Sequence, residues 1–315
     1  MGRVQANRKK RAGHTPGDVF RAGRVLNTNT IRAFRRKVWK YFCSRGRTFS
    51  WRETRDPYAI LVSEYMLQQT QVGRVEEKFP AFVARFPGAA TLSAAPLREV
   101  LSAWQGLGYN RRAVALHRAA AILVDQYGGQ VPADQEALLS LPGVGPSTAA
   151  GVLAFAFNQP VVLLETNIRR VYLHHFFLGR DPVPDREILP LVAATLDRKR
   201  PREWYWALMD LGSELRRLPE NPNRRSPAYR PQSPFHGSDR QIRGRILRAL
   251  LREGTLDHGG AADVAGCAPG RLNRILEGME REGFLERTTD GGISIREGAG
   301  SRRKLSVTRP GTRTP

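Results

Sequence analysis

The sequence has few cysteines and no long apolar run, and each absence excludes a class of protein. Its two cysteines, Cys43 and Cys267, lie far apart in a chain of 315 residues. Two cysteines exclude a disulfide framework and a four-cysteine metal site, and they indicate a reducing compartment. Because no run of about 18 apolar residues is present, we expect no transmembrane helix. The basic N-terminus has no apolar segment behind it, so it does not have the pattern of a secretory signal.

Acidic residues are also scarce: the chain has 29 of them against 51 lysines and arginines, a net charge of +22. This balance excludes an acidic, solvating chain and favours a polyanionic partner, with DNA or RNA first and a membrane surface second. The excess of positive charge is concentrated in two stretches. Residues 1–50 have 14 basic and one acidic residue, and residues 213–252 have 10 basic and 3 acidic residues. Clustered charge favours contact with phosphates. The alternative is that these runs are merely solvated.

Apolar residues make up 41% of the chain, and their spacing of three and four predicts an all-α fold in the first two thirds. Glycine and proline pairs separate the expected helices, and no strand is expected between 56 and 215. The length is enough for about two domains. The predicted helices cover residues 28–43, 57–71, 75–86, 91–95, 96–104, 110–127, 134–140, 146–157, 167–178, 185–196 and 203–215.

The rest of the chain divides by composition. Residues 1–28 read as a disordered basic arm, 216–238 as a basic linker rich in proline and arginine, and 297–315 as a basic disordered tail. Between them, 239–296 show helices over 239–252, 261–265 and 270–282 and then a hairpin signal at Asp290-Gly291-Gly292. This order predicts a small winged-helix-like (α+β) domain.

Two motifs suggest chemistry. Leu141-Pro142-Gly143-Val144-Gly145-Pro146-Ser147 is a tight turn before a helix, and such a turn presents backbone N–H groups that suit a phosphate. An ordinary turn between helices is equally compatible with it. Glu64 lies in the apolar stretch that runs from Pro57 to Leu67. A carboxyl group in apolar surroundings is a candidate general acid because burial raises its pKa, although a salt-bridged or capping role is the simpler alternative.

Four segments occur in an order that is much more specific than any one of them: PYAILVSEYMLQQTQV from Pro57, GLGYN from Gly106, LPGVGPSTA from Leu141 and ETNIRRV from Glu165. Together they resemble the helix-hairpin-helix (HhH-GPD) DNA glycosylases of base excision repair. The similarity is greatest to MutY-like adenine glycosylases, with endonuclease III as a more distant relative. It covers about residues 30–215, so the expected glycosylase domain is 29–215.

The resemblance implies roles for individual residues. Glu64 would be the general acid that protonates the departing base, and Asn167 would support the second catalytic carboxylate. Gln68 and Gln69 would enter the duplex beside the flipped nucleotide, with Tyr109 as a wedge. Gly143, Val144 and Gly145 would hold a backbone phosphate, in this family often through a monovalent cation. Ser147 occupies the position where lyase relatives carry a Schiff-base lysine, and no lysine lies between Lys78 and Lys199.

Three departures from the family matter. Glu165 stands where the family has its catalytic aspartate, so the side chain here is one methylene longer. The four cysteines that normally hold an iron–sulfur cluster are absent, and so is the Nudix-like C-terminal domain that reads 8-oxoguanine. The stretch 216–238, with Arg224 and Arg225, occupies the place of the cluster and is expected to contact DNA. We therefore expect no cofactor beyond a possible monovalent cation.

The leading hypothesis is a monofunctional N-glycosylase that removes adenine mispaired with guanine or 8-oxoguanine. One alternative is a thymine or uracil mismatch glycosylase of the same fold, and another is a DNA-damage-binding protein that has lost catalysis through Glu165. The winged-helix-like domain could be the main DNA reader or a protein-interaction module. The expected partner is double-stranded DNA with a mispair or damaged base. The chain is expected to act as a monomer in the cytoplasm, associated with the nucleoid and with no membrane.

Overall fold

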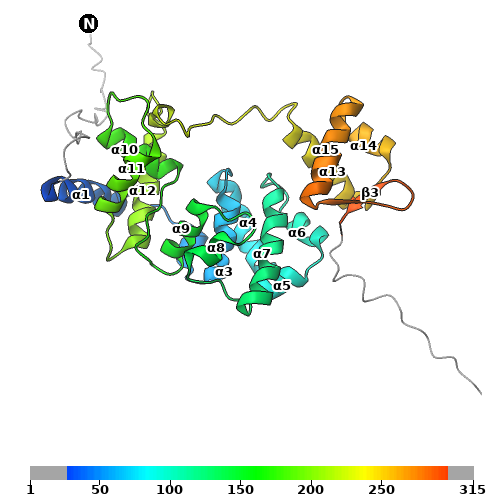
Figure 1. Cartoon of the computed structure of the whole chain (residues 1–315), viewed down its shortest axis with the longest axis horizontal. Coiled ribbons are helices and arrows are strands. Elements are labelled where there is room, and N and C mark those ends of the chain that lie inside the picture. The colour runs from blue at the N-terminus through cyan, green and yellow to red at the C-terminus, as the bar shows by residue number, and fades with distance from the viewer. Residues whose placement is uncertain (1–26, 297–315) are drawn as a thin grey trace, which may run out of the picture. The chain divides into compact units, whose positions relative to one another are not determined.

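A computed structural model describes residues 27–296 of the chain (Figure 1). The predicted arm over 1–28, except for its last two residues, and the predicted tail over 297–315 lie outside the described residues. The described residues group into two units, 27–47 with 162–230 and 48–161 with 231–296. Each unit is therefore built from two separate stretches of the chain.

The fold is mostly helical with one small sheet near the C-terminus, as predicted. In chain order the elements are α1 (Thr28–Arg45), α2 (Ser50–Glu53), α3 (Pro57–Leu67), α4 (Val72–Arg85), α5 (Ala89–Ala94), α6 (Leu97–Ala103), α7 (Arg111–Tyr127), α8 (Gln135–Leu139), α9 (Pro146–Phe155), α10 (Thr166–Phe176), α11 (Asp185–Thr195), α12 (Pro201–Leu215), the 3₁₀ helix η1 (Pro222–Arg225), α13 (Asp239–Glu253), β1 (Thr255–Leu256), α14 (His258–Ala265), α15 (Pro269–Glu282), β2 (Leu285–Arg287) and β3 (Ile293–Ile295). Among the described residues, no helix is long and apolar enough to cross a membrane.

The first unit is packed around aromatic side chains. Phe34 of α1 lies with its ring centroid 5.5 Å from that of Tyr172 on α10 and 6.1 Å from that of Trp204 on α12, and all three side chains are fully buried. A Cβ atom at Gly212 of α12 would lie 2.2 Å from the carbonyl oxygen of Asn167. The missing side chain at Gly212 thus lets α12 approach the first turn of α10 closely, and this packing positions the residues at that turn.

In the second unit α3 packs against α4, α7 and α9. Asp56 caps α3 by accepting from the backbone N–H groups of Tyr58 and Ala59 at 3.1 Å each, and Pro57 occupies the first helical position, where its missing N–H costs nothing. Eight of the eleven α3 residues are buried. A helix that is apolar on nearly every side belongs to a core, and it carries the acidic Glu64 into that core.

The C-terminal stretch contains α13, α14, α15 and an antiparallel sheet with the strand order β1-β3-β2. The predicted hairpin is confirmed: β2 pairs with β3, and the turn between them closes with the Thr288 N–H donating to the Gly292 carbonyl at 3.0 Å. The helices and strands follow the order predicted for a winged helix, an assignment that stays a prediction. The sequence pattern missed β1, because a strand of two residues shows no alternation.

Several predicted boundaries were wrong. The helix predicted over 57–71 ends at Leu67, because Gln68 leaves the helical conformation and Gln69 has a left-handed backbone with φ of +55°. The short α2 was not predicted. The stretch 216–238, predicted as a linker, contains η1, in which Pro222 and Asn223 are buried, whereas residues 231–237 are exposed. The stretch is therefore anchored at η1, and its segment 231–237 is exposed throughout.

Candidate active site

Glu64 lies half-buried in the middle of α3, where it faces α9. A Cβ atom built at Gly151 of α9 would lie 2.4 Å from the Glu64 Oε2 atom and 3.0 Å from its Cδ atom. No side chain would fit between the two helices at this level. The glycine therefore makes the room in which the predicted acid is held, and Gly151 is a site residue that sequence reasoning missed.

The turn before α9, predicted to bind a phosphate, is shaped by two glycines. Gly143 has φ of +82°, and a Cβ atom there would lie 2.9 Å from the Ala115 Cβ atom. Gly145 has open space where its side chain would be, and no side chain caps the α9 N-terminus that follows it. Val144 is buried and anchors the turn, and Ser147 is exposed. The uncapped N–H groups at a helix start form an anion site together with the helix dipole.

Two side chains hold this turn: Tyr65 on α3 and Gln68 at the C-cap of α3. The Tyr65 hydroxyl donates to the Pro142 carbonyl at 2.5 Å. The Gln68 amide donates to the Gly143 carbonyl at 3.2 Å and to the Thr148 hydroxyl at 3.1 Å. Gln68 therefore links the end of the helix that carries Glu64 to the predicted phosphate-binding turn, a contact that the sequence did not indicate.

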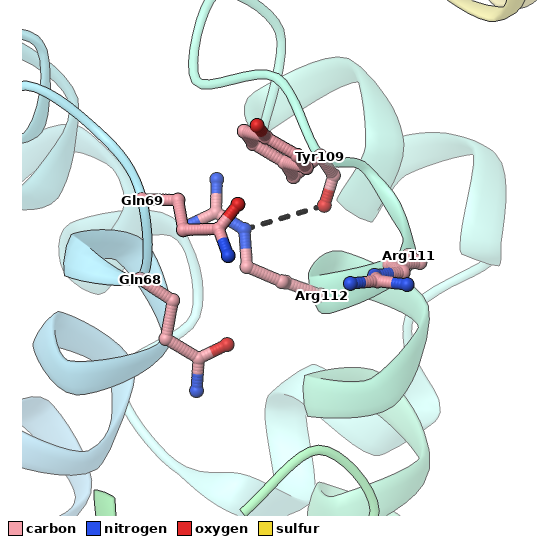
Figure 2. A pocket seen from close by; sticks show the side chains of 5 residues that line it. All are labelled: Gln68, Gln69, Tyr109, Arg111 and Arg112. Carbon is pink, nitrogen blue, oxygen red and sulfur yellow. Dashed lines mark hydrogen bonds between the residues drawn. The ribbon is translucent and has the colours of Figure 1, made fainter. Parts of the chain in front are cut away.

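Gln69 and Tyr109 lie on either side of a small pocket of about 50 Å³, shown in Figure 2 with the other side chains that line it, Gln68, Arg111 and Arg112. The pocket is too small for a nucleobase. Gln69 has φ of +55° and Tyr109 has φ of +45°, which is uncommon for residues other than glycine. Residues with side chains stay in this backbone conformation only where the surrounding structure holds them there.

Arg112, which was not predicted, holds the backbone around these two residues. Its guanidinium, which reaches between Gln69 and Tyr109 in Figure 2, is 5% exposed, and burial lowers its pKa to about 10, so it remains charged at neutral pH. The guanidinium donates to the α3 carbonyls of Tyr65 at 2.7 Å and Met66 at 2.8 Å. It also donates to the Thr70 hydroxyl, and to the carbonyls of Leu107, Gly108 and Tyr109 in the turn before α7. One buried cation thus ties the end of α3 to the turn that carries Tyr109.

Glu165 is the N-cap of α10. Its Oε1 atom accepts from the backbone N–H groups of Asn167 at 2.7 Å and Ile168 at 2.9 Å. The Asn167 amide donates to the Oε2 atom at 3.4 Å, so Asn167 contacts this carboxylate, and its role in catalysis stays a prediction. Burial raises the pKa of the Glu165 carboxyl, while these donors and the nearby Arg170 and Arg169 act in the opposite direction.

Arg170 fixes the orientation of Asn167. It is 4% exposed, and its Nη1 atom donates to the Asn167 side-chain oxygen at 2.8 Å and to the Gly212 carbonyl at 2.7 Å. With its oxygen occupied by Arg170, the Asn167 amide presents its NH₂ group to Glu165. The Arg170 Nε atom donates to Asn221, which lies just before η1. The carboxylate of Glu165 is therefore held by a chain of side chains that includes the stretch after α12.

The same stretch holds the rest of α10. The Asn223 amide donates to the Thr166 carbonyl at 3.0 Å. The Arg225 guanidinium donates to the carbonyls of Leu173, at 3.0 Å, and Phe177, where it caps the C-terminal end of the helix. Arg224 is exposed. Of the two arginines predicted to contact DNA, Arg225 is engaged inside the protein and Arg224 points to solvent.

The predicted site residues therefore form two groups, each within one unit. The second unit holds Glu64, Gln68, Gln69, Tyr109 and the turn with Gly143, Val144, Gly145 and Ser147. The first unit holds Glu165, Asn167, Arg224 and Arg225. Arg112, Gly151 and Arg170 could have been suspected from their places beside the quoted motifs, but their partners are distant in sequence.

Comparison with known proteins assigns the family. Residues 62–189 match the profile described as "HhH-GPD superfamily base excision DNA repair protein". The chain is 36% identical to the adenine DNA glycosylase of Mycolicibacterium smegmatis over 256 residues, which covers 76% of this chain and 87% of that protein. It is 35% identical to the thymine/uracil-DNA glycosylase of Methanothermobacter thermautotrophicus over 131 residues, which covers 41% of this chain and 59% of that protein.

Among solved structures, a thermostable thymine-DNA glycosylase is similar in fold. It has a TM-score of 0.56 and 24% sequence identity, and the match covers 64% of this chain and 94% of that one. An identity this low bears on the fold alone. The profile match, together with 36% identity to an adenine DNA glycosylase over 87% of that protein, shows that the chain belongs to the HhH-GPD superfamily of base excision DNA repair proteins.

Proposed function

We propose that the protein is a DNA glycosylase that hydrolyses the N-glycosidic bond of adenine mispaired with guanine or 8-oxoguanine. The observation that carries the proposal is the placement of one acidic side chain, Glu64, in the core helix whose C-terminal end holds Gln68 and Gln69. The similarity to an adenine DNA glycosylase, which extends over 87% of that protein, supports adenine as the base. The similarity to a thymine/uracil-DNA glycosylase is confined to 41% of this chain and makes that activity the second candidate.

The proposed reaction uses two carboxyl groups. Cleavage of an N-glycosidic bond passes through a sugar with oxocarbenium character, so the base must leave as a neutral group and the positive sugar must be stabilised. Glu64 donates its proton to a ring nitrogen of the departing adenine. Glu165, in its ionised form and oriented by Asn167, stabilises the positive sugar until water adds at C1′, and the proton that this water loses restores the Glu64 carboxyl group. The products are free adenine and an intact strand with an abasic site.

The nucleotide must leave the base stack before either carboxyl group can reach it. In the proposal Gln69 and Tyr109 enter the space that it vacates, and Arg112 holds the Tyr109 carbonyl and the residues Met66 and Thr70 on either side of Gln69. The turn at Gly143 and Gly145 binds a phosphate of the same strand, with or without a monovalent cation. Duplex DNA with a mispair is the partner, and a single chain is the acting unit.

We propose that strand cleavage is not part of the reaction. A lyase step needs an amine that attacks the sugar. Ser147 occupies the position where such an amine would lie, and its hydroxyl cannot form a Schiff base. No lysine lies between Lys78 and Lys199. The product strand should break only after treatment with alkali.

The iron–sulfur cluster of the family does not fit this chain. Such a cluster needs four thiolates, and the whole sequence has two cysteines, on α1 and between α14 and α15. Within residues 27–296, no group of three or more histidine, cysteine and acidic side chains is placed to hold a metal. We propose that Asn221, Asn223 and Arg225 brace α10 in place of a cluster. Iron analysis of the purified protein should find none.

The test is a panel of duplexes that carry adenine opposite guanine, 8-oxoguanine, cytosine or thymine, together with thymine and uracil opposite guanine. Abasic sites are revealed by alkali. Release of adenine opposite guanine and 8-oxoguanine supports the proposal, and loss of release in Glu64→Gln assigns it to this site. Release of thymine or uracil alone would favour the second candidate, and no release from any duplex would favour a DNA-binding protein without catalysis.

A further inference from the structure

Helix α13 contacts the 48–161 part of the second unit at both of its ends. Near its start, the Arg240 Nη1 atom donates to the Tyr109 hydroxyl at 2.5 Å, and the Arg240 guanidinium lies over the Tyr109 ring, 5.2 Å from its centroid. Near its end, the Arg98 guanidinium of α6 donates to the Leu251 carbonyl at 2.5 Å. All of these residues belong to the second unit. The helix is therefore held beside the residue that is assigned as the DNA wedge.

The sides of α13 follow from its helical period. At about 100° per residue, the contact positions Arg240 and Leu251 lie within about 20° of each other, on one side of the helix. A second side, roughly 180° to 280° around the helix from Arg240, packs on α14, α15 and the sheet through buried residues, Ile242, Ile246, Ala249 and Leu250. The strip at roughly 80° to 140° lies between these two packed sides and is left for another contact.

This strip carries a ridge of exposed arginines, Arg245, Arg248 and Arg252. They are spaced by three and four residues, so their side chains are neighbours along the surface of the helix. The one other residue on the strip is the uncharged Gln241. Arg252 pairs with Glu253, which lies next to it in the chain. The ridge therefore has charge of one sign, and it is strongest at Arg245 and Arg248.

We propose that this arginine ridge binds the phosphate backbone of the duplex that flanks the flipped nucleotide. The inference rests on the proposed function, because the ridge takes its position on DNA from Tyr109 as the wedge. Arginines that neutralise phosphates release the counterions condensed on DNA, which favours binding. A fixed strip with several arginines and no acid is complementary to a row of phosphates. Its place on the helix that contacts Tyr109 favours duplex DNA over an acidic protein as the occupant.

The helix geometry gives the expected distance from the wedge. Arg245 and Arg248 lie about 8 and 12 Å along α13 from Arg240, at about 1.5 Å per residue. Each strand of duplex DNA has one phosphate per about 3.4 Å of its axis, so this distance corresponds to roughly two to four nucleotides. With the reach of an arginine side chain, the contacted phosphates should lie roughly two to five nucleotides from the flipped one.

The exposed face of α15 offers a matched control. Arg274 and Arg281 are exposed and seven residues apart, but the exposed Glu277 lies between them on the same face. An acid three and four residues away offsets the charge of both arginines. Replacing this pair by alanine removes the same charge from the C-terminal stretch as replacing Arg245 and Arg248.

The first test measures how salt affects binding to a duplex that carries tetrahydrofuran, a stable abasic analogue, opposite guanine. The slope of log binding constant against log salt should fall by up to about 1.8 in Arg245→Ala/Arg248→Ala, about 0.9 for each lost phosphate contact. Arg245→Lys/Arg248→Lys should keep the slope, because lysine also binds phosphate as a point charge. The control Arg274→Ala/Arg281→Ala should keep it too. Circular dichroism and thermal unfolding check that each variant is folded.

The second test locates the contact. Methylphosphonate linkages, which carry no charge, replace the phosphates roughly two to five nucleotides to the 5′ or the 3′ side of tetrahydrofuran, on one strand at a time. On the duplex whose neutral linkages lie under the ridge, Arg245→Ala/Arg248→Ala should bind within about twofold of the wild type, because the lost contact is already absent there. On the other duplexes this variant should bind more weakly than the wild type.

Three results would overturn the inference. An unchanged slope in Arg245→Ala/Arg248→Ala would leave the ridge as solvated charge, and an equal fall in Arg274→Ala/Arg281→Ala would show that net charge alone matters. A deficit of the same size on every methylphosphonate duplex would show that the ridge does not contact the flanking phosphates. Failure of the proposed function has a different signature, because the wild type would release no adenine from any mispair while the salt slopes still reported on the ridge.

Discussion

The Glu165 carboxylate accepts the backbone N–H of Asn167 at 2.7 Å, and the Asn167 amide lies 3.4 Å from the other carboxylate oxygen. One side chain thus both caps α10 and supplies the carboxylate that the proposed reaction needs. The helix N-terminus carries a partial positive charge that favours an anion at this position. Burial acts against the anion and raises the pKa of Glu165. Burial and the helix N-terminus therefore have opposite effects on the charge of this carboxyl group.

This conflict predicts that Glu165→Gln is more stable than the wild type at neutral pH. A carboxyl whose pKa is raised by folding favours the folded state while it is protonated, and this contribution is lost as the pH rises through the folded-state pKa. The neutral amide can still accept the two backbone N–H groups but has no charge to bury. Thermal unfolding at pH 7 should show a higher Tm for Glu165→Gln. The difference should vanish below about pH 4, where the wild-type carboxyl is protonated as well.

Glu165→Asp should keep both the cap and measurable base release, whereas Glu165→Gln should release no base. Aspartate is among the best N-cap residues and reaches the same two N–H groups with a shorter side chain. It keeps the negative charge that opposes the positive sugar, and glutamine does not. Single-turnover assays on the mispair panel measure both variants. Equal activity of Glu165→Gln and wild type would show that this carboxylate has no part in the reaction.

Gly151→Ala should slow base release by about 10- to 100-fold with little effect on duplex binding. The new Cβ atom would lie 2.4 Å from the Glu64 Oε2 atom, so the carboxyl group must move. Displacing a catalytic group by about 1 Å can cost about 10²-fold in rate. Gly73→Ala is the matched control, because it also adds a methyl group on a helix but has no atom within 4 Å of the new Cβ. If both variants release base at the wild-type rate, Glu64 does not depend on the room at Gly151.

Arg112→Lys should lower the free energy of unfolding by several kcal/mol, because breaking a buried charged network leaves its acceptors unpaired. Lysine keeps the charge but cannot reach both the Tyr65 carbonyl and the Gly108 carbonyl, which Arg112 joins at 2.7 and 2.8 Å. Arg111→Lys, one residue away and exposed, should leave the free energy of unfolding unchanged. Denaturant unfolding of the three proteins measures the difference. The role given to Arg112 would be wrong if its variant were as stable as the control.

Replacing Arg224 should change the salt dependence of DNA binding, whereas replacing Arg225 should change thermal stability. Arg224→Ala should reduce the slope of log binding constant against log salt by up to about 0.9, the amount for one lost phosphate contact on duplex DNA, and leave the Tm unchanged. Arg225→Ala should instead lower the Tm, since its guanidinium caps the end of α10 through Leu173 and Phe177. Titrations at several salt concentrations and thermal unfolding check the pair. A slope unchanged in Arg224→Ala would leave this arginine as solvated charge only.

The sequence alone was enough for the features that depend on neighbours in the chain. Asp56 and Pro57 mark the start of α3, Glu165 stands one residue before α10, and Asp290-Gly291-Gly292 marks the hairpin. Caps and turns are interactions over two to four residues, so their residue types indicate them directly. The order of the motifs was also sufficient for the family, because chance does not produce four specific segments in one order.

Only the tertiary structure decided which residues hold the site in place. The partners of Arg112 on α3 lie up to 47 residues away, Asn223 meets Thr166 across 57 residues, and Arg240 meets Tyr109 across 131 residues. The space at Gly151 exists only because α9 packs on α3. Such contacts depend on how helices pack, and packing brings together side chains that no local pattern relates. The sequence therefore determined the helices and the chemical groups, and packing determined how those groups are supported.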